Sequence, residues 1–210
     1  MIVGGGSVAQ RKVETLAEYG ADLYLAALAL TPALQEQVDL GRVRFLGTEF
    51  RESDLDGATL AVAATDDPEL NRRVSLSARQ RGVLVNAVDQ PSECTFIVPA
   101  ILRRGDLVFA VSTSGKSPAL ARRLREDLGA LFGPEYEPYV RLMGRLREEI
   151  LSGSAAHSER EKIFRGLVRS DLLDGIRAGQ WERVASTINR ILGTGFTVSE
   201  IQGFARSSEP

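Results

Sequence analysis

The segment Gly4-Gly5-Gly6-Ser7-Val8-Ala9 has the residue types and the spacing of a phosphate cradle. In the pattern Gly-x-Gly-x-x-Ala the first glycine permits a tight turn and the second lets the backbone approach a diphosphate. The small last residue lets a helix pack closely on a strand. The pattern predicts a dinucleotide site at Gly4, Gly6, Ser7 and Val8, with the helix-start N–H groups on the diphosphate. The alternative is a glycine-rich turn without a ligand.

One part of that fingerprint is missing. An acidic side chain usually follows the second strand and holds the ribose hydroxyls, but residues 21–32 contain only Asp22, at the start of the strand, and no Arg for a 2′-phosphate. The choice between NAD and NADP therefore stays open at this position, where backbone groups or Thr31 could serve. The first strand has only residues 1–3, against the usual ~5–6, which leaves open whether residues are missing before it.

Alternating strand and helix patterns surround the glycine turn. Apolar residues recur at helical spacing over 7–19, and the segment after residue 65 has the helix-start signals Asp66, Asp67 and Pro68. Such alternation predicts an α/β fold with a Rossmann-like parallel sheet. The predicted strands are Leu23–Leu28, Val43–Leu46, Leu60–Ala63 and Val83–Val88.

The pattern changes after residue 95. Two apolar runs with a turn at Arg104–Gly105 predict a β-hairpin, and Ser117 followed by Pro118 predicts a capped helix start. Helical patterns fill the rest, interrupted by a linker at 151–162. We therefore expect a nucleotide-binding domain at 1–94, a hairpin and helix segment for dimerisation and substrate binding at 95–150, and a small helical domain at 151–210.

Composition limits the classes of function. The chain is 43% hydrophobic and 26% charged, with no apolar run of about 20 residues and no leader pattern, so we expect a cytoplasmic protein without a membrane span. Residues 1–115 hold 11 Lys and Arg against 15 Asp and Glu, and residues 116–210 hold 15 against 13, which argues against nucleic-acid binding. The single cysteine, Cys94, excludes an internal disulfide. The only histidine, His157, falls in the predicted linker, so no histidine-based metal site is expected.

Three blocks in order resemble the precorrin-2 dehydrogenase and sirohydrochlorin ferrochelatase family, which includes the N-terminal module of sirohaem synthase. They are VGGGSVAQRKVETLAEYGA, VAATDDPELNRRV and VNAVDQPSECTFIVPAILRRGDLVFAVSTSGKSPALARRLRE. The resemblance is dense from residue 3 to about 128 and thinner beyond. It implies oxidation of the tetrapyrrole precorrin-2 to sirohydrochlorin with NAD⁺, and an intimate homodimer. Some family members also insert Fe²⁺, and for this chain that activity stays undecided.

The resemblance also implies roles for residues. Removal of a hydride leaves a proton for a base, and Asp89 matches the family's aspartate implicated in the chemistry, although turn capping is the alternative. Two further groups are expected to bind ligands. The cofactor contacts are Ala64, Thr65, Asp66, Asn86 and Val88, and the carboxylates of the substrate would be bound by Ser114, Lys116, Ser117 and Arg122.

Two other classes of protein fit part of the sequence. NAD-binding regulatory modules of potassium transport combine a glycine turn with a strand that ends in Ala-x-x-Asp-Asp, and they sense the cofactor without chemistry. They give no reason for the segment 85–107 or for a capped basic helix. A different NAD-dependent oxidoreductase would usually present His, Lys or Tyr beside the nicotinamide, and no such arrangement stands out.

Overall fold

The computed structural model describes residues 1–154 and 156–206. The chain divides into two compact units, Met1–Val98 and Pro99–Pro210, each of which is described by itself below. The predicted boundary between 94 and 95 lies just before the observed one. The predicted third segment and the predicted second segment from Pro99 onward both fall in the second unit.

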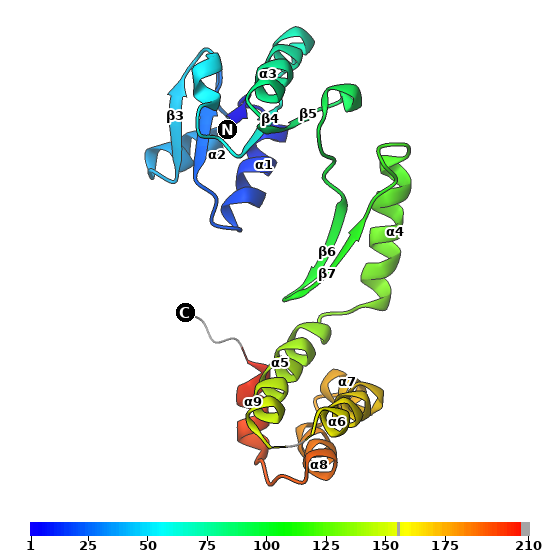
Figure 1. The fold of residues 1–210 in the computed structure, drawn as a ribbon. Coiled ribbons are helices and arrows are strands. Elements are labelled where there is room, and N and C mark those ends of the chain that lie inside the picture. Colours follow the sequence, from blue (N-terminus) through cyan, green and yellow to red (C-terminus); the bar gives the residue numbers. More distant parts are fainter. Residues whose placement is uncertain (155, 207–210) are drawn as a thin grey trace. The chain divides into compact units, whose positions relative to one another are not determined.

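A five-stranded parallel sheet forms the first unit. Its strand order is β3-β2-β1-β4-β5, and β1 (Ile2–Val3) lies in the centre, between β2 (Leu23–Ala26) and β4 (Leu60–Ala63). The outer strands are β3 (Val43–Gly47) and β5 (Leu84–Ala87). Two residues are enough for β1 because both are completely buried between neighbouring strands. This is the predicted Rossmann-like sheet, which can be followed in Figure 1.

Helices cover both faces of this sheet because its side chains alternate with a period of two. Ile2, Leu25 and Val62 pack with α1 (Ser7–Ala17) and α2 (Pro32–Asp39) in one apolar core. Val3 and Ala63 point the other way, into a core with α3 (Pro68–Gln80) and the short helix η1 (Glu52–Leu55). The sheet is thus buried on both sides, as a parallel sheet requires.

The predicted helix starts are present. The Asp67 carboxylate accepts hydrogen bonds from the backbone N–H groups of Glu69 and Leu70, and Pro68 is the first residue of α3. The cap is therefore Asp67 rather than Asp66. In the second unit, the Ser117 hydroxyl accepts from the N–H of Leu120.

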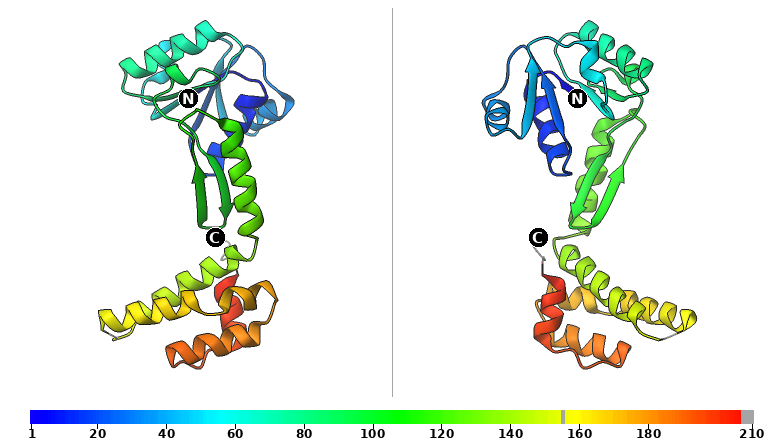
Figure 2. Two further views of the ribbon diagram at one scale, coloured as in Figure 1. Left: turned by 90° about the vertical axis from the view of Figure 1, so that its right-hand side faces the viewer. Right: turned by 60° about the vertical axis from the view of Figure 1, so that its left-hand side comes forward.

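The second unit begins with the predicted hairpin. β6 (Ala100–Arg104) pairs antiparallel with β7 (Leu107–Val111), and α4 (Pro118–Leu131) packs against both strands, as Figure 2 shows. The short helix η2 (Pro91–Glu93) precedes the hairpin in the chain. Alternate residues of each strand face α4, while Ile101 and Val108 stay exposed.

In the described part of the chain, five helices complete this unit around one apolar core that includes Leu142, Leu146, Leu167 and Ile188. They are α5 (Tyr136–Ser152), α6 (His157–Arg169), α7 (Leu172–Arg177), α8 (Trp181–Leu192) and α9 (Val198–Ala205). The predicted linker at 151–162 is wrong in extent, because α5 continues to Ser152 and α6 already begins at His157. His157 is therefore a helix-start residue rather than part of a linker.

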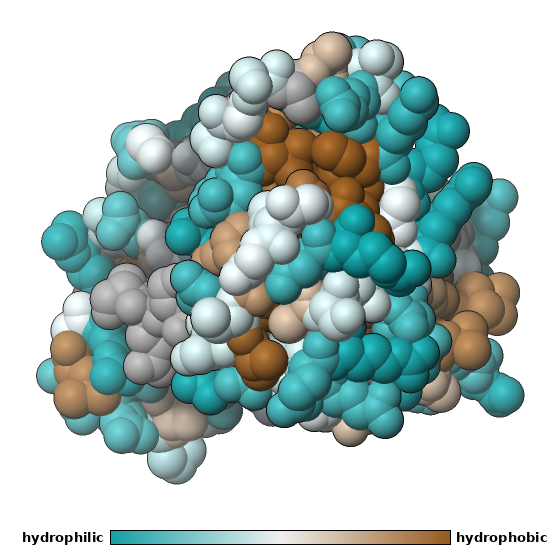
Figure 3. Space-filling model, turned by 90° about the horizontal axis from the view of Figure 1, so that it is seen from below, coloured by the Kyte–Doolittle hydropathy of each residue, from teal (hydrophilic) through white to brown (hydrophobic). Residues whose placement is uncertain are grey.

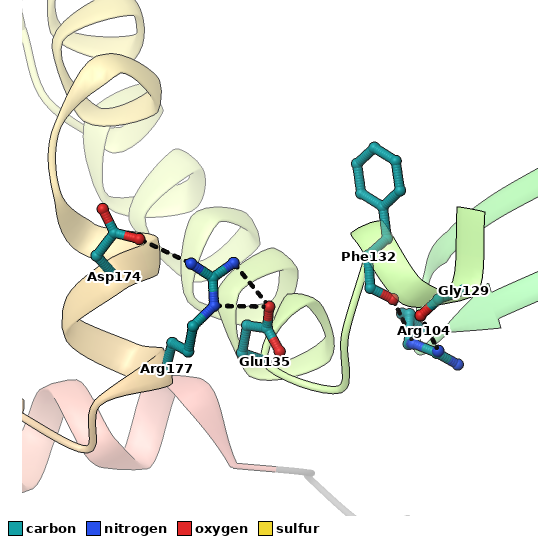
Figure 4. A network of polar contacts seen from close by, with 6 residues as sticks. All are labelled: Arg104, Gly129, Phe132, Glu135, Asp174 and Arg177. Atoms are coloured by element: carbon teal, nitrogen blue, oxygen red, sulfur yellow. Dashed lines mark hydrogen bonds and ion pairs between the residues drawn. The ribbon is translucent and has the colours of Figure 1, made fainter. Parts of the chain in front are cut away.

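Polar contacts fix the connection between α4 and α5 (Figure 4). Arg104 of β6 donates to the carbonyl oxygen of Phe132 over 2.9 Å, and Arg177 of α7 donates to the Glu135 carboxylate over 2.9 and 3.0 Å. The rings of Phe109, Phe132 and Tyr136 follow one another with centroid separations of 4.4 and 5.1 Å. Hairpin and helical bundle are thereby joined through the connection.

Several large apolar side chains of the second unit are exposed. In the face drawn in Figure 3, apolar residues reach the surface among hydrophilic ones. The exposed large apolar residues of the hairpin and α4 are Ile101, Val108, Leu120, Leu124 and Leu131. None of the described helices is both long and apolar enough to cross a membrane.

Candidate dinucleotide site and the turns beside it

A cavity of about 560 Å³ opens at the carboxyl ends of β1, β2 and β4. Ligands of open α/β sheets bind at this edge. Most of its lining residues lie at the ends of these three strands or in the loops that follow them, and the others come from the loop after β3 and from α3. The lining residues are Val3–Gly6, Ala26–Thr31, Thr48, Phe50, Ala64–Asp67 and Leu70.

The glycines of the turn fit a cradle for a diphosphate. Gly4 has a φ of +120°, and a Cβ atom on it would overlap the carbonyl group of Ala64. A Cβ on Gly5 would overlap the carbonyl oxygen of Ala29. On Gly6, by contrast, a Cβ would enter open space, with no atom within 4 Å. Gly4 and Gly5 thus let the loops pack together, and Gly6 leaves room for a ligand.

The start of α1 supplies hydrogen-bond donors to this space. Gly6 is the N-cap residue and has no side chain, so no side-chain group caps the first turn. The first N–H groups of a helix, here those of Ser7, Val8 and Ala9, have no partner within the helix. Together with the helix dipole they favour a bound anion. These residues therefore fit the diphosphate of a dinucleotide.

The β4–α3 loop forms another part of the wall, and Thr65 is held there by the Asn71 side chain and by hydrogen bonds between its hydroxyl and the Asp67 backbone. The Asn71 Oδ1 atom accepts from the Thr65 backbone N–H (3.1 Å) and the Thr65 hydroxyl (2.8 Å). Its Nδ2 atom donates to the Thr65 carbonyl oxygen over 3.0 Å. Asn71 is buried. The sequence analysis missed this residue, and the signal that could have found it is an asparagine within an amphipathic helix, where asparagine is a poor helix former.

The wall after β2 carries no acidic side chain. It contains Leu28, which is 87% exposed, and Thr31, whose hydroxyl donates to Gln10 Oε1 over 2.8 Å. The Thr31 oxygen also accepts from the Leu34 N–H at the start of α2. Thr31 thus joins α1 to α2 at the cavity edge. Among the residues that the structure describes, the charged ones that line the cavity are Asp66 and Asp67.

Asp89 lies in a turn directly after β5. Its φ of 59° is in the left-handed region, where residues other than glycine are uncommon. Gln90 donates from Nε2 to the Pro68 carbonyl oxygen over 3.2 Å, which ties the turn to the start of α3. Residues other than glycine that are held in this conformation are often found at functional sites. The Asp89 side chain is exposed at the carboxyl end of the sheet.

The segment after this turn runs back along β5 and is fixed there by side chains. Asn86 donates from Nδ2 to the Phe96 carbonyl oxygen over 3.2 Å. Thr95 Oγ1 accepts from the Val85 N–H over 2.7 Å. The Cys94 thiol lies 3.2 Å from both the backbone nitrogen and oxygen of Ala87. The amide of Asn86 therefore binds the chain itself, and Cys94 is half-buried and hydrogen-bonded.

The expected substrate-binding residues form a turn in the second unit. Ser114 has a φ of 53°, which is in the left-handed region. Among the described residues, Asp89 is the one other non-glycine residue with a positive φ. The Ser117 N–H donates to Thr113 Oγ1 over 3.0 Å, and the Ser117 hydroxyl caps α4. Lys116 and Arg122 are exposed. The predicted substrate-binding residues thus belong to a turn and a capped helix start.

The structure brings only some of the predicted residues together. Gly4, Gly6, Ala64, Thr65 and Asp66 line one cavity, and Ser7 and Val8 follow it at the start of α1. Asn86, Val88 and Asp89 lie at the end of the neighbouring strand β5, outside the lining. Within residues 1–154 and 156–206, no three His, Cys, Asp or Glu side chains gather as metal ligands.

Comparison with known proteins yields two family matches. Residues 1–100 match the family described as "Putative NAD(P)-binding". Residues 104–131 match the family described as "Sirohaem biosynthesis protein central". The first match covers the cavity and the Asp89 turn, and the second covers most of the hairpin and α4.

Similar curated proteins are longer than this chain. It is 39% identical to the siroheme synthase of Methylobacillus flagellatus over 83% of its own length and 38% of that protein. It is 36% identical to the siroheme synthase of Sodalis glossinidius over 93% of its own length and 41% of that protein. The chain thus spans about two-fifths of the length of these relatives. A solved structure described as SirC, a precorrin-2 dehydrogenase, matches with a TM-score of 0.78 and 25% identity, covering 92% of this chain and 93% of that one.

Proposed function

From its membership of the precorrin-2 dehydrogenase and sirohydrochlorin ferrochelatase family, to which this chain belongs, we propose that it oxidises precorrin-2 to sirohydrochlorin with NAD⁺. The observation that carries the proposal is the structural match to SirC, a precorrin-2 dehydrogenase. The match covers nearly the whole length of both chains. The cradle at the carboxyl end of the sheet supports a dinucleotide as the oxidant.

The reaction sets the tasks that the residues must perform. Precorrin-2 loses two electrons as a hydride and also loses a proton, giving sirohydrochlorin, NADH and H⁺. Bound NAD⁺ supplies the hydride acceptor. The backbone at Gly6, Ser7 and Val8 would hold its diphosphate, with Ala64, Thr65 and Asp66 beside the rest of the cofactor.

Asp89 is proposed as the base that takes the proton from the carbon skeleton. A carboxylate is a suitable acceptor, and its place after a strand is where open α/β sheets carry reacting groups. The left-handed turn supports this role, because strained backbone often occurs at functional sites. Asn86 and Val88 would position the turn at the nicotinamide end.

The substrate would be held by the second unit. Precorrin-2 carries several carboxylates, and Ser114, Lys116, Ser117 and Arg122 offer hydroxyl groups, positive charge and a helix N-terminus. Lys116 and Arg122 are exposed, so both charges are accessible to a ligand.

We also propose that NAD is used in preference to NADP. The charged groups that line the cavity are the carboxylates of Asp66 and Asp67, and no Lys or Arg is among the lining residues. The added 2′-phosphate of NADP would therefore meet charges of its own sign within the cavity. Use of NAD⁺ as oxidant also supports a cytoplasmic location.

The active form is proposed to be a homodimer. A two-stranded sheet is marginally stable by itself, and here one of its faces leaves Ile101 and Val108 exposed. The exposed leucines of α4 extend the apolar surface of the same unit. The family resemblance implies a second copy of this chain as the partner.

The direct test is an anaerobic assay of the purified chain with precorrin-2 and NAD⁺. We expect NADH and sirohydrochlorin to form in equal amounts. With NADP⁺ in place of NAD⁺, sirohydrochlorin should form more slowly. A regulatory module would bind NAD⁺ but give no turnover, and that result would contradict the proposal. The match of residues 104–131 to the sirohaem family favours the dehydrogenase over such a module.

A further inference from the structure

We propose that Asn71 is a positioning residue for the dinucleotide, because its amide fixes the loop that forms one wall of the cavity. The inference rests on the proposed function, since the loop serves binding only if the cavity takes NAD. Asn71 does not line the cavity itself and so acts through Thr65.

Among the described residues, the side-chain amide of Asn71 makes its hydrogen bonds to Thr65. Oδ1 accepts from the N–H and the hydroxyl of Thr65, and Nδ2 donates to its carbonyl oxygen, over 2.8 to 3.1 Å. Asn71 is only 3% exposed, so these bonds form away from water. A buried and satisfied polar network fixes one conformation, and a broken one is costly.

The fixed loop is the one that meets the glycine turn. Ala64 and Thr65 line the cavity, and the Ala64 carbonyl lies where a Cβ of Gly4 would be. The Ala64 N–H donates to the Val3 carbonyl oxygen over 2.8 Å, which holds only the beginning of the loop. Asn71 holds the next residue. The loop is thereby ordered before a ligand arrives, and preordered sites bind more tightly.

The start of α3 does not need this side chain. The Asp67 carboxylate already accepts from the N–H groups of Glu69 and Leu70. The Asn71 N–H donates to the Asp67 carbonyl oxygen in the regular helical pattern. A side chain that served only the helix would therefore be redundant here, whereas Thr65 has three of its polar groups engaged by Asn71.

The first test compares Asn71→Ala with Ser77→Ala in the full chain. Ser77 is also 3% exposed and lies on the same helix, but it does not line the cavity. Isothermal titration with NAD⁺ should show a Kd raised about tenfold or more by Asn71→Ala, as expected for lost hydrogen bonds. Ser77→Ala should stay within about twofold of wild type. Without ligand, the Thr65 amide should exchange with solvent faster only in Asn71→Ala.

A second variant guards against loss of folding. Asn71→Asp keeps the volume, and when its carboxyl is protonated one oxygen can accept from Thr65 while the other donates to the Thr65 carbonyl. Ionisation removes that donor. Burial and the nearby Asp66 and Asp67 should raise the pKa of the new carboxyl. The Kd for NAD⁺ should therefore fall toward the wild-type value as the pH is lowered, whereas Asn71→Ala should show no such recovery.

The outcomes separate the inference from the proposed function. If wild type binds NAD⁺ but folded Asn71→Ala binds equally well, with unchanged Thr65 exchange, the positioning role is wrong and the dehydrogenase proposal stands. If Asn71→Ala does not fold, the test rests on Asn71→Asp. The positioning role is then wrong if the Kd of Asn71→Asp for NAD⁺ depends on pH no more than that of wild type. If wild type does not bind NAD⁺, both proposals fail. The test of Asn71 measures NAD⁺ binding and amide exchange, not turnover of precorrin-2. It therefore stays decisive if wild type binds NAD⁺ but does not oxidise precorrin-2.

Discussion

Gly4 lies so close to Ala64 that a Cβ atom on Gly4 would overlap the Ala64 carbonyl oxygen. The two residues follow neighbouring parallel strands, β1 and β4, whose last residues Val3 and Ala63 are paired. The missing side chain therefore lets two loops meet at the edge of the sheet. Gly6, two residues later, faces open space and has ordinary extended backbone.

Gly4→Ala should destabilise the first unit. The methyl group would collide with backbone that cannot rotate away, and the φ of +120° disfavours any side chain. We expect a loss of about 3 kcal/mol or more in the free energy of unfolding, measured by urea denaturation. An unchanged midpoint would mean that the loops are not packed as described.

Gly6→Val should separate folding from binding at the same turn. Its extended φ of −81° suits a β-branched residue, and the side chain would enter the space assigned to the diphosphate. The melting temperature should stay within a few degrees of wild type, while the Kd for NAD⁺ rises at least about tenfold. Tight NAD⁺ binding by this variant would place the diphosphate elsewhere.

Much of the fold was predictable because local signals and the final structure agree. The predicted strand Leu60–Ala63 is β4 to the residue, and Asp67 and Ser117 cap the helices as their types suggest. The glycine pattern located the cavity because Gly4 makes the tight turn and Gly6 leaves open space for a ligand, as the pattern predicts.

Other features depend on contacts that no local pattern contains. Asn71 is important through Thr65, six residues away on the other side of a turn. The left-handed backbone of Asp89 and Ser114 arises from turns held by surrounding groups, since neither residue type requires it. His157 follows a Ser- and Gly-rich segment, which predicts a linker, but α6 begins at this residue.

Val108→Glu should dissociate the proposed dimer. Val108 is 46% exposed and is paired across the hairpin with Arg103. A glutamate at this position lies opposite a positive charge in its own hairpin, but its carboxylate would be unfavourable in an apolar interface. Sedimentation should give the mass of one chain, 22.8 kDa, for the variant and twice that for wild type. Val168→Glu, on α6, is the control and should leave the mass unchanged. A monomeric wild type would contradict the dimer.

The ion pair of Glu135 with Arg177 should make the second unit acid-sensitive. Hydrogen bonding from its own backbone, together with the Arg177 side chain, lowers the pKa of the Glu135 carboxyl. Because the folded pKa is lowered, the stabilisation is present above the unfolded pKa and is lost as the pH falls through the folded one. Glu135→Gln should therefore have a lower melting temperature than wild type at pH 7, and the difference should shrink in acid. A difference that is constant with pH would exclude this role.

The central claim is tested most directly by anaerobic turnover of precorrin-2 with NAD⁺ by wild type and Asp89→Asn. Asparagine tolerates left-handed backbone, so the turn should persist while the base is lost. We predict at least about a hundredfold slower formation of NADH and sirohydrochlorin, with the Kd for NAD⁺ within about twofold of wild type. The exposed Asp22→Asn, as control, should react at the wild-type rate. Wild-type turnover by Asp89→Asn would remove Asp89 from the chemistry, and no turnover by wild type would contradict the dehydrogenase itself.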